Sequence, residues 1–279
     1  MRFEINVRSM HPLSPSGTRI SRLSKTMIPL RDTNPTVIRP FVNWMIIAAG
    51  LAVFFLLQPQ TNPESTVFVY EWAAIPCELT TMDALDIREL ETGLCIRSDA
   101  GGSHLFPDKS IWLSVVVSMF LHGGIGHLLG NMWILWIFGN NAEEAFGSGG
   151  FLLFYLASGA LATAGYVFLN PDSTIPLVGA SGAIAGVMGA YLVLFPRARV
   201  TSIVPFLFFM PFDVPAWIYL ILWFWGQFAL VGQAGKIAWE AHVAGFVFGL
   251  VVAVALRSRL LRRVTALHRR ALPRRLRRR

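Results

Sequence analysis

Long apolar runs, separated by short polar segments, fill the chain between residues 41 and 256. A helix needs about 20 apolar residues to cross the roughly 30 Å core of a bilayer. Six runs reach or approach this length, and each predicts a membrane-spanning helix: residues 41–57, 111–139, 151–169, 175–195, 214–231 and 238–256. Another apolar run, 203–212, is too short to span and contains Pro205 and Pro211, so it predicts an interfacial segment leading into the fifth helix.

The composition excludes two broad classes of protein. Hydrophobic residues make up 54% of the 279 residues and charged residues only 14%, whereas a soluble domain carries about 25% charged residues. A water-soluble enzyme and a disordered chain are therefore both excluded. The net charge of +8 does not indicate a nucleic-acid partner, because 11 of the 24 basic residues are arginines within residues 257–279. The sequence predicts an all-α polytopic membrane protein.

The basic residues also predict the orientation of the spans, because Lys and Arg favour the cytoplasmic side. Residues 1–40 contain seven basic and two acidic residues, and the tail after residue 256 contains no acid. Residues 58–110 contain nine acids and three basic residues, which indicates a large external loop between helices 1 and 2. Six spans place both basic termini on one side. We therefore expect a multi-pass protein of the cytoplasmic (inner) membrane with both termini in the cytoplasm.

Three segments follow from this topology: a cytosolic basic extension (1–40), a six-span domain (41–256) and an Arg-rich cytosolic tail (257–279). Residues 1–26 are basic and Ser-rich, so they fit a mitochondrial presequence, a short extension, or an over-extended start with Met27 as the true initiator. We expect the tail to bind anionic lipid headgroups. The external loop holds both cysteines, Cys77 and Cys95, which either form a disulfide or remain free thiols.

Polar side chains inside the predicted spans are functional candidates, because placing them in lipid is costly. The second span holds His122, His127 and Asn131, the fourth holds Ser181, and the sixth holds His242. At about 1.5 Å per residue from each cytosolic end, His127, Ser181 and His242 share a height of roughly 20–22 Å above the inner boundary. His127 and Asn131 share a face of a continuous helix, whereas His122 lies about 140° from His127. We expect His122 to hold the external loop or the top of its helix instead.

Small residues predict which helices touch. They recur every four residues in the fourth span, as Gly182 and Gly186, and in the sixth span, as Gly245 and Gly249. Such stripes let transmembrane backbones approach closely, so we expect these two spans to abut along the face that carries the serine and the histidine. The glycines alone are equally explained by helix packing, but packing does not explain an ionisable residue at matching depth.

The paired side chains suggest acyl-transfer chemistry. An imidazole within hydrogen-bond reach of a serine hydroxyl can take its proton and produce a nucleophile. The reaction also needs donors for the developing oxyanion, and the candidates are the Ser181 backbone N–H and the side chains of His127 and Asn131. Glu240 precedes His242 by two residues and lies near the outer end, so no acid is placed to orient the ring. We expect a Ser–His dyad in which packing and aromatic neighbours hold His242.

Three motifs carry a resemblance to a known family: H-x-x-x-x-H-x-x-x-N in the second span (His122, His127, Asn131), G-x-S-G in the fourth (Gly179, Ser181, Gly182) and A-H-x-x-G-x-x-x-G in the sixth (Ala241, His242, Gly245, Gly249). Together they closely resemble the rhomboid intramembrane serine proteases, as does the segment MIPLRDTNPT at residues 27–36. The resemblance covers about residues 41–256 and implies a six-transmembrane-helix rhomboid-like bundle.

The same resemblance implies Ser181 as nucleophile, His242 as base, and His127 and Asn131 with the Ser181 amide as oxyanion hole. It implies transmembrane protein substrates, cleaved in or next to the membrane-spanning helix of single-pass proteins, with lateral entry past the fifth span. Cofactors and metals are not implied. Many members have Trp-Arg before the second span, whereas Trp112 is followed by Leu113 here. Glu143 matches an acidic position of the family, and we expect it to bond backbone at the cytosolic end.

Three other functions fit the pattern less well. A catalytically inactive rhomboid-like protein that binds membrane segments would generally lack the serine or the histidine, and this chain has both. A transporter or channel with a midplane polar site would call for acids within the spans, and none is found there. A metal site would need His122 to join His127 and His242, because two imidazoles are too few for a closed zinc site.

Overall fold

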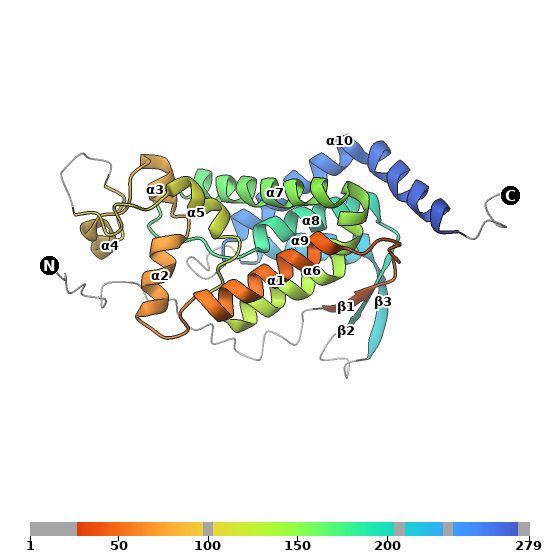
Figure 1. Cartoon of the computed structure of the whole chain (residues 1–279), viewed down its shortest axis with the longest axis horizontal. Helices are drawn as coiled ribbons and strands as arrows, with labels where there is room; N and C mark the ends of the chain where they lie inside the picture. The colour runs from red at the N-terminus through yellow and green to blue at the C-terminus, as the bar shows by residue number, and fades with distance from the viewer. Residues whose placement is uncertain (1–26, 97–102, 204–209, 231–236, 273–279) are drawn as a thin grey trace.

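The computed structural model describes residues 27–96, 103–203, 210–230 and 237–272 (Figure 1). The expectations for residues 1–26 and for the end of the tail, 273–279, concern segments outside these described residues. The fold is mostly helical with one small sheet. Its elements are β1 (Ile28–Asp32), α1 (Phe41–Ala52), the π-helical η3 (Val53–Leu57), α2 (Glu64–Trp72), α3 (Pro76–Thr81), α4 (Ile87–Thr92), α5 (Ile111–Val117), α6 (Ile125–Phe146), α7 (Ser148–Leu169), α8 (Ser181–Leu194), β2 (Arg199–Ile203), β3 (Pro211–Pro215), α9 (Ala216–Phe228) and α10 (Trp239–Ala271).

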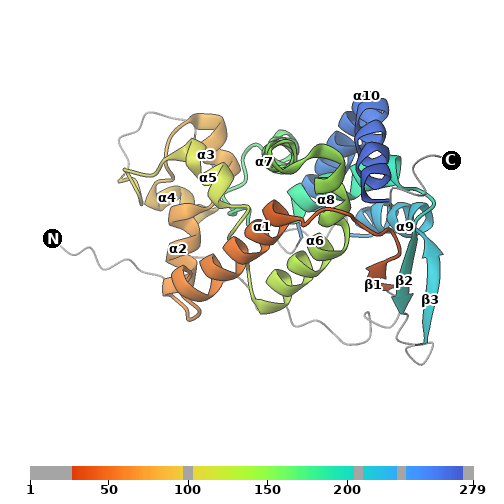
Figure 2. The same cartoon turned by 45° about the vertical axis from the view of Figure 1, so that its right-hand side comes forward.

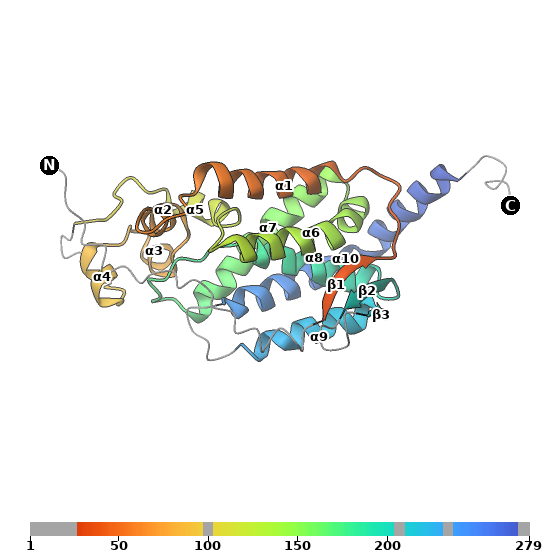
Figure 3. The same ribbon diagram turned by 90° about the horizontal axis from the view of Figure 1, so that it is seen from below.

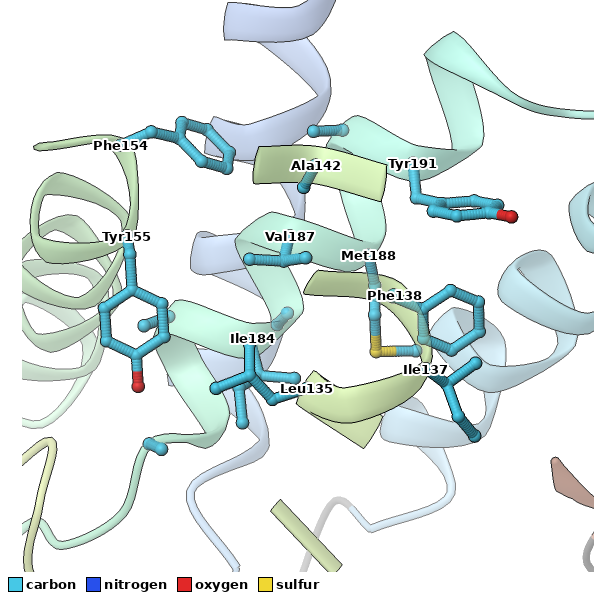
Figure 4. Close-up of a cluster of buried hydrophobic side chains, with 14 of the residues drawn as sticks. Leu135, Ile137, Phe138, Ala142, Phe154, Tyr155, Ile184, Val187, Met188 and Tyr191 are labelled. Atoms are coloured by element: carbon cyan, nitrogen blue, oxygen red, sulfur yellow. The ribbon is translucent and has the colours of Figure 1, made fainter. Parts of the chain in front are cut away.

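Helix α8 occupies the centre of the bundle, between α6, α7 and α10, while α1 and α9 lie at opposite edges (Figures 2 and 3). Most of its residues are buried, and its sequence is rich in glycine and alanine. Its larger side chains point into a shared apolar core, where the Tyr191 ring lies 4.9 Å from that of Phe138 on α6 (Figure 4). Ile184 and Met188 fill the same core together with Leu135. The central helix is therefore fixed on all sides by packing.

Glycines set the spacing between α8 and α10. A Cβ atom built on Gly245 would overlap the carbonyl oxygen of Gly182, and one built on Gly249 would overlap that of Gly186. No larger residue fits while the two backbones remain this close. The fourth and sixth apolar runs therefore abut along their small-residue stripes, as the sequence predicts.

Large apolar side chains cover the outer surface of the bundle. Trp136 on α6, Phe168 on α7 and Trp225 on α9 are more than half exposed, which is unfavourable in water and suits contact with lipid. Within the described residues, α7 and α10 are long and apolar enough to cross a membrane, and Phe41–Leu57, Ser181–Leu194 and Ala216–Phe228 are shorter apolar helices.

Several predicted boundaries were wrong. Residues 111–139 do not form one helix: α5 ends at Val117, and residues 118–124 lead without helix into α6. The predicted helix 175–195 begins only at Ser181. Before it, Leu177 forms an isolated β-bridge with Ala74, so the backbone there is not helical. The sixth helix continues to Ala271, well past the end of its apolar run. The distribution of apolar residues alone does not show where these helices begin and end.

The segment at 203–212 leads into α9 as predicted, and its position at the membrane interface stays a prediction, but its strand structure was not predicted. Its two ends belong to strands β2 and β3, and residues 204–209 between them lie outside the described residues. With β1 these strands form an antiparallel sheet in the order β1-β2-β3. Asp32, at the end of β1, accepts a hydrogen bond of 2.6 Å from the Tyr191 hydroxyl, which attaches the sheet to the central helix.

The described residues after η3, 58–96 and 103–110, contain the short helices α2, α3 and α4 and have their own apolar cluster. Cys77 and Cys95 form a disulfide, which resolves the two alternatives left by the sequence. Beside it, Lys109 Nζ lies 2.6 Å from Glu78 Oε2, and both side chains are almost fully buried. Burial raises the pKa of Glu78 and lowers that of Lys109. This region contacts the loop between α7 and α8 through the Cys77 N–H, which donates to the Ser173 carbonyl.

Candidate active site

The polar residues singled out in the sequence come together at the beginnings of three helices. His127 is the third residue of α6, Ser181 the first of α8 and His242 the fourth of α10. The beginnings of α8 and α10 meet because the two helices run parallel, with Gly182 against Gly245 and Gly186 against Gly249, and the beginning of α6 meets them through Gly179. The beginning of a helix carries a partial positive charge and free backbone N–H groups. The site is therefore set up to interact with negative charge.

Ser181 and His242 are directly hydrogen-bonded, with 2.8 Å between the serine Oγ and the histidine Nε2. Both residues are partly buried. The glycine contacts between α8 and α10 lie just below them and hold the two backbones at this separation. The Trp223 ring lies 6.0 Å from the His242 ring and forms one wall beside it.

A further residue contacts His242, and the sequence analysis missed it. The Gln227 side chain on α9 is 6% exposed, and its Oε1 lies 2.7 Å from His242 Nδ1. The expected aromatic neighbour is present as Trp223, but the expectation that packing and aromatic neighbours hold the imidazole without a hydrogen bond was wrong. The available signal was an uncharged polar residue inside the fifth apolar run, whereas polar residues were sought in the second, fourth and sixth runs.

Gly179 brings the loop before α8 against α6. Its φ of +122° is one that L side chains rarely adopt, and a Cβ there would lie 2.7 Å from His127 Cε1 and 3.6 Å from Asn131 Nδ2. Only glycine allows this approach. The loop is also held from the other side, because the Gly179 N–H donates to the Ser118 carbonyl at 2.9 Å. His127 and Asn131 thus lie beside the backbone that leads into Ser181.

The Asn131 side-chain nitrogen is buried and has no hydrogen-bond partner among the described residues. A buried amide donor without a partner is costly. The Asn131 nitrogen lies beside Gly179, two residues before α8 begins. His127 is more exposed, so the described residues leave this side of the site uncovered. This side lies toward the end of the bundle that carries α2, α3 and α4 (Figure 1).

Of the two predictions for His122, the angle of its side chain was wrong, and its role in holding the top of the helix agrees with the structure. Because α6 begins only at Ile125, a helical wheel does not apply to His122, and its ring lies 5.3 Å from that of His127. Its backbone, however, does hold the region in front of the helix. The Gln58 side chain donates to the His122 carbonyl at 2.6 Å and accepts from the His122 N–H at 3.1 Å.

Other predicted residues lie outside the site. The Glu143 carboxylate accepts hydrogen bonds from the N–H groups of Val42 and Asn43 and from the Ser148 hydroxyl, so it bonds backbone as expected. Trp112 is largely exposed on α5. Among the described residues, the group with metal-ligand spacing is Cys77, Glu89 and Cys95, and its two sulfurs are joined to each other.

Fold and site together define a class: an α-helical membrane bundle in which a hydrogen-bonded serine and histidine meet where helices begin. The Rhomboid domain model matches residues 109–259, more than half of the chain. The chain therefore belongs to the rhomboid family, which is membrane-embedded and includes serine proteases as well as inactive members.

Three relatives show the extent of the similarity. Over 144 residues the chain is 31% identical to "Rhomboid protein 1, mitochondrial" of Saccharomyces cerevisiae, covering 50% of this chain and 40% of that protein. Over 82 residues it is 45% identical to "Rhomboid protease GluP" of Bacillus subtilis, covering 29% and 15%. Over 96 residues it is 34% identical to "Putative rhomboid protease YdcA" of Bacillus subtilis, covering 34% and 48%. The chain thus spans less than half the length of each of these relatives.

Proposed function

We propose that this protein is an intramembrane serine endopeptidase that hydrolyses peptide bonds in or next to the transmembrane segments of single-pass membrane proteins. The observation that carries the proposal is the 2.8 Å hydrogen bond between Ser181 Oγ and His242 Nε2. Serine needs an adjacent base to become a nucleophile. Membership of a family that includes serine proteases supports the same reaction.

In the proposed reaction, Ser181 Oγ attacks the carbonyl carbon of the scissile bond while His242 Nε2 takes the hydroxyl proton. The tetrahedral intermediate collapses, the C–N bond breaks, and the imidazolium returns its proton to the leaving amine. Water then attacks the acyl-enzyme ester with His242 again accepting the proton, and the free carboxyl product leaves with Ser181 restored. The exposure of His127 supports access of this water from one end of the bundle.

The oxyanion of both tetrahedral intermediates would be bound beside Gly179. The Asn131 amide, which has no partner among the described residues, and the His127 ring are the side-chain donors, and the Ser181 N–H at the beginning of α8 is the backbone donor. The positive end of the α8 dipole adds to this effect. Losing one such donor typically lowers turnover about 100- to 1,000-fold. No cofactor or metal takes part in this scheme.

The proposed topology has six spans within a domain at residues 41–256: α1 with η3, α6, α7, α8, α9 and α10. Helix α8 is only about 21 Å long, so with its end at the cytoplasmic boundary Ser181 lies below the outer surface of a core of about 30 Å. We propose a cytoplasmic (inner) membrane location, a basic segment 1–40 and an Arg-rich tail 257–279 on the cytoplasmic side, and residues 58–110 outside. Membrane lipids then surround the exposed aromatic residues of α6, α7 and α9.

The main alternative is a catalytically inactive member that binds transmembrane segments without cleaving them. A binding protein does not need a serine hydroxyl and an imidazole at hydrogen-bond distance within an apolar bundle, where polar groups are costly. The geometry of Ser181 and His242 therefore favours the protease.

Purified protein in liposomes with a model single-pass substrate tests the proposal. We expect Ser181→Ala and His242→Ala each to abolish cleavage while both variants still fold. A fluorophosphonate probe should label the wild-type protein and not Ser181→Ala. Ser148→Ala is the matched control, because Ser148 lies at the opposite end of the bundle and bonds Glu143. Full cleavage by Ser181→Ala would refute the mechanism.

A further inference from the structure

Helix α9 supplies a hydrogen-bond acceptor for the ring nitrogen of His242 that points away from the serine. Nε2 of the imidazole is 2.8 Å from Ser181 Oγ, and Nδ1 is 2.7 Å from Gln227 Oε1. Both nitrogens of the ring are therefore engaged. Gln227 is almost completely buried, so water does not readily replace its contact.

The other end of the Gln227 amide shows which atom faces the ring. Its Nε2 donates to the Trp223 carbonyl, one turn earlier in α9, at 3.0 Å. A carbonyl oxygen can only accept, so the NH₂ group is the end that points to α9 and the amide oxygen is the end that points to His242. An amide oxygen is also only an acceptor. The proton of the neutral imidazole must then be on Nδ1, which leaves the Nε2 lone pair free to accept from the serine.

We propose that Gln227 is a positioning residue that holds His242 in its Nδ1–H tautomer, so that the catalytic unit is Ser181–His242–Gln227 and not a dyad. Without this acceptor the neutral ring can carry its proton on Nε2, and that tautomer cannot take a proton from Ser181. The contact also fixes the rotation of the ring. This inference rests on the proposed protease function and adds a third residue to its machinery.

The use of an amide in this position has a physical reason. In soluble serine proteases a carboxylate orients the histidine of the triad and stabilises the imidazolium, but an isolated carboxylate inside an apolar, lipid-embedded bundle is costly to bury. An amide gives the same direction to the hydrogen bond without a buried charge. Its second end is satisfied within its own helix by the Trp223 carbonyl.

The test compares Gln227→Met, which keeps the volume and removes the acceptor, with Gln227→Glu. Because the apolar bundle favours the neutral acid, the Glu side chain keeps a carbonyl oxygen toward His242 Nδ1 and donates its O–H to the Trp223 carbonyl in place of the amide N–H. We expect Gln227→Met to lower kcat about 10- to 100-fold with KM for the model substrate nearly unchanged, and to slow fluorophosphonate labelling of Ser181 by a similar factor. Gln227→Glu should recover most of kcat. Leu222→Met is the control, because this side chain lies on the same helix and is mostly exposed.

The outcomes separate the two proposals. Wild-type protein that neither cleaves nor is labelled would overturn the protease function itself. A cleaving wild type with unchanged kcat in folded Gln227→Met would overturn only the role of Gln227, as would a fall in kcat that Gln227→Glu does not recover. If Gln227→Met does not fold, ¹⁵N NMR of wild-type His242, assigned with His242→Ala, decides: a proton on Nδ1 supports the inference and a proton on Nε2 overturns it.

Discussion

The closest approach between α8 and α10 predicts that one methyl group, placed about 10 Å from the serine and histidine, disrupts their contact. Gly249 lies seven residues after His242, on the face of α10 that packs against α8. In Gly249→Ala the new Cβ would lie 2.6 Å from the carbonyl carbon and 2.7 Å from the Cα of Gly186. These are backbone atoms, so no side chain can rotate away to make room.

The size of the effect follows from these distances. The two backbones must separate by more than about 1 Å before ordinary van der Waals contact is restored, because the Gly186 carbonyl oxygen lies even closer than these carbons. A hydrogen bond of 2.8 Å that lengthens by this amount is no longer a hydrogen bond. Misplacement of a catalytic group by about 1 Å can cost on the order of 100-fold in rate, and overpacking typically costs about 1–3 kcal/mol in the free energy of unfolding. We expect losses of both kinds.

Two measurements on the purified variant check this prediction: kcat for the model substrate, and thermal unfolding in the same detergent. Gly149→Ala is the matched control, because Gly149 is also helical but a Cβ there has no neighbour within 4 Å. It should match the wild type in both measurements. A Gly249→Ala variant that is destabilised but keeps the wild-type kcat would refute the idea that the glycine stripe sets the catalytic distance.

Two predictions concern residues 58–110. Lys109→Met leaves the buried Glu78 carboxyl without its ion-pair partner, and we expect the free energy of unfolding in urea to fall by about 3–5 kcal/mol. Adding Glu78→Gln should recover most of that loss. If the double variant recovers nothing, the loss is not a charge effect. Replacing Cys77 and Cys95 together by serine opens a loop with a sequence separation of 18, which should cost about 3 kcal/mol. Wild-type protein treated with reductant should show the same shift in its unfolding curve, and an unchanged curve would contradict the prediction.

Much of the bundle could be predicted because helix length and small-residue spacing leave direct signals in the sequence. Residues 41–57 are helical throughout, as α1 followed by η3, because the apolar run and the helix have the same bounds. The contact between α8 and α10 follows from glycines at four-residue spacing. The stripes bring the two helices together, and the matching height of Ser181 and His242 on them predicts that these side chains meet.

The unpredicted features are those in which a loop is as apolar as a helix. Leu121 is completely buried although it lies in the non-helical segment between α5 and α6. Its hydrophobicity reports burial and not backbone conformation, so the second apolar run reads as one helix. The error then passed to His122, whose angle was counted on a helix that does not exist there. The sheet was missed because each strand has only five residues and β3 begins and ends with proline.

Gln227 could have been found as a candidate but not assigned a partner. A polar amide within the apolar run 214–231 is itself unusual, yet α9 has no small-residue stripe that fixes its rotation against α10. Only the structure shows that this side chain turns toward His242 and not toward α8 or lipid. An acid near His242 was sought by analogy with the carboxylate that orients the histidine in soluble serine proteases. In an apolar bundle the cost of burying that charge favours a neutral acceptor, so the residue to look for beside a lipid-embedded histidine is an amide.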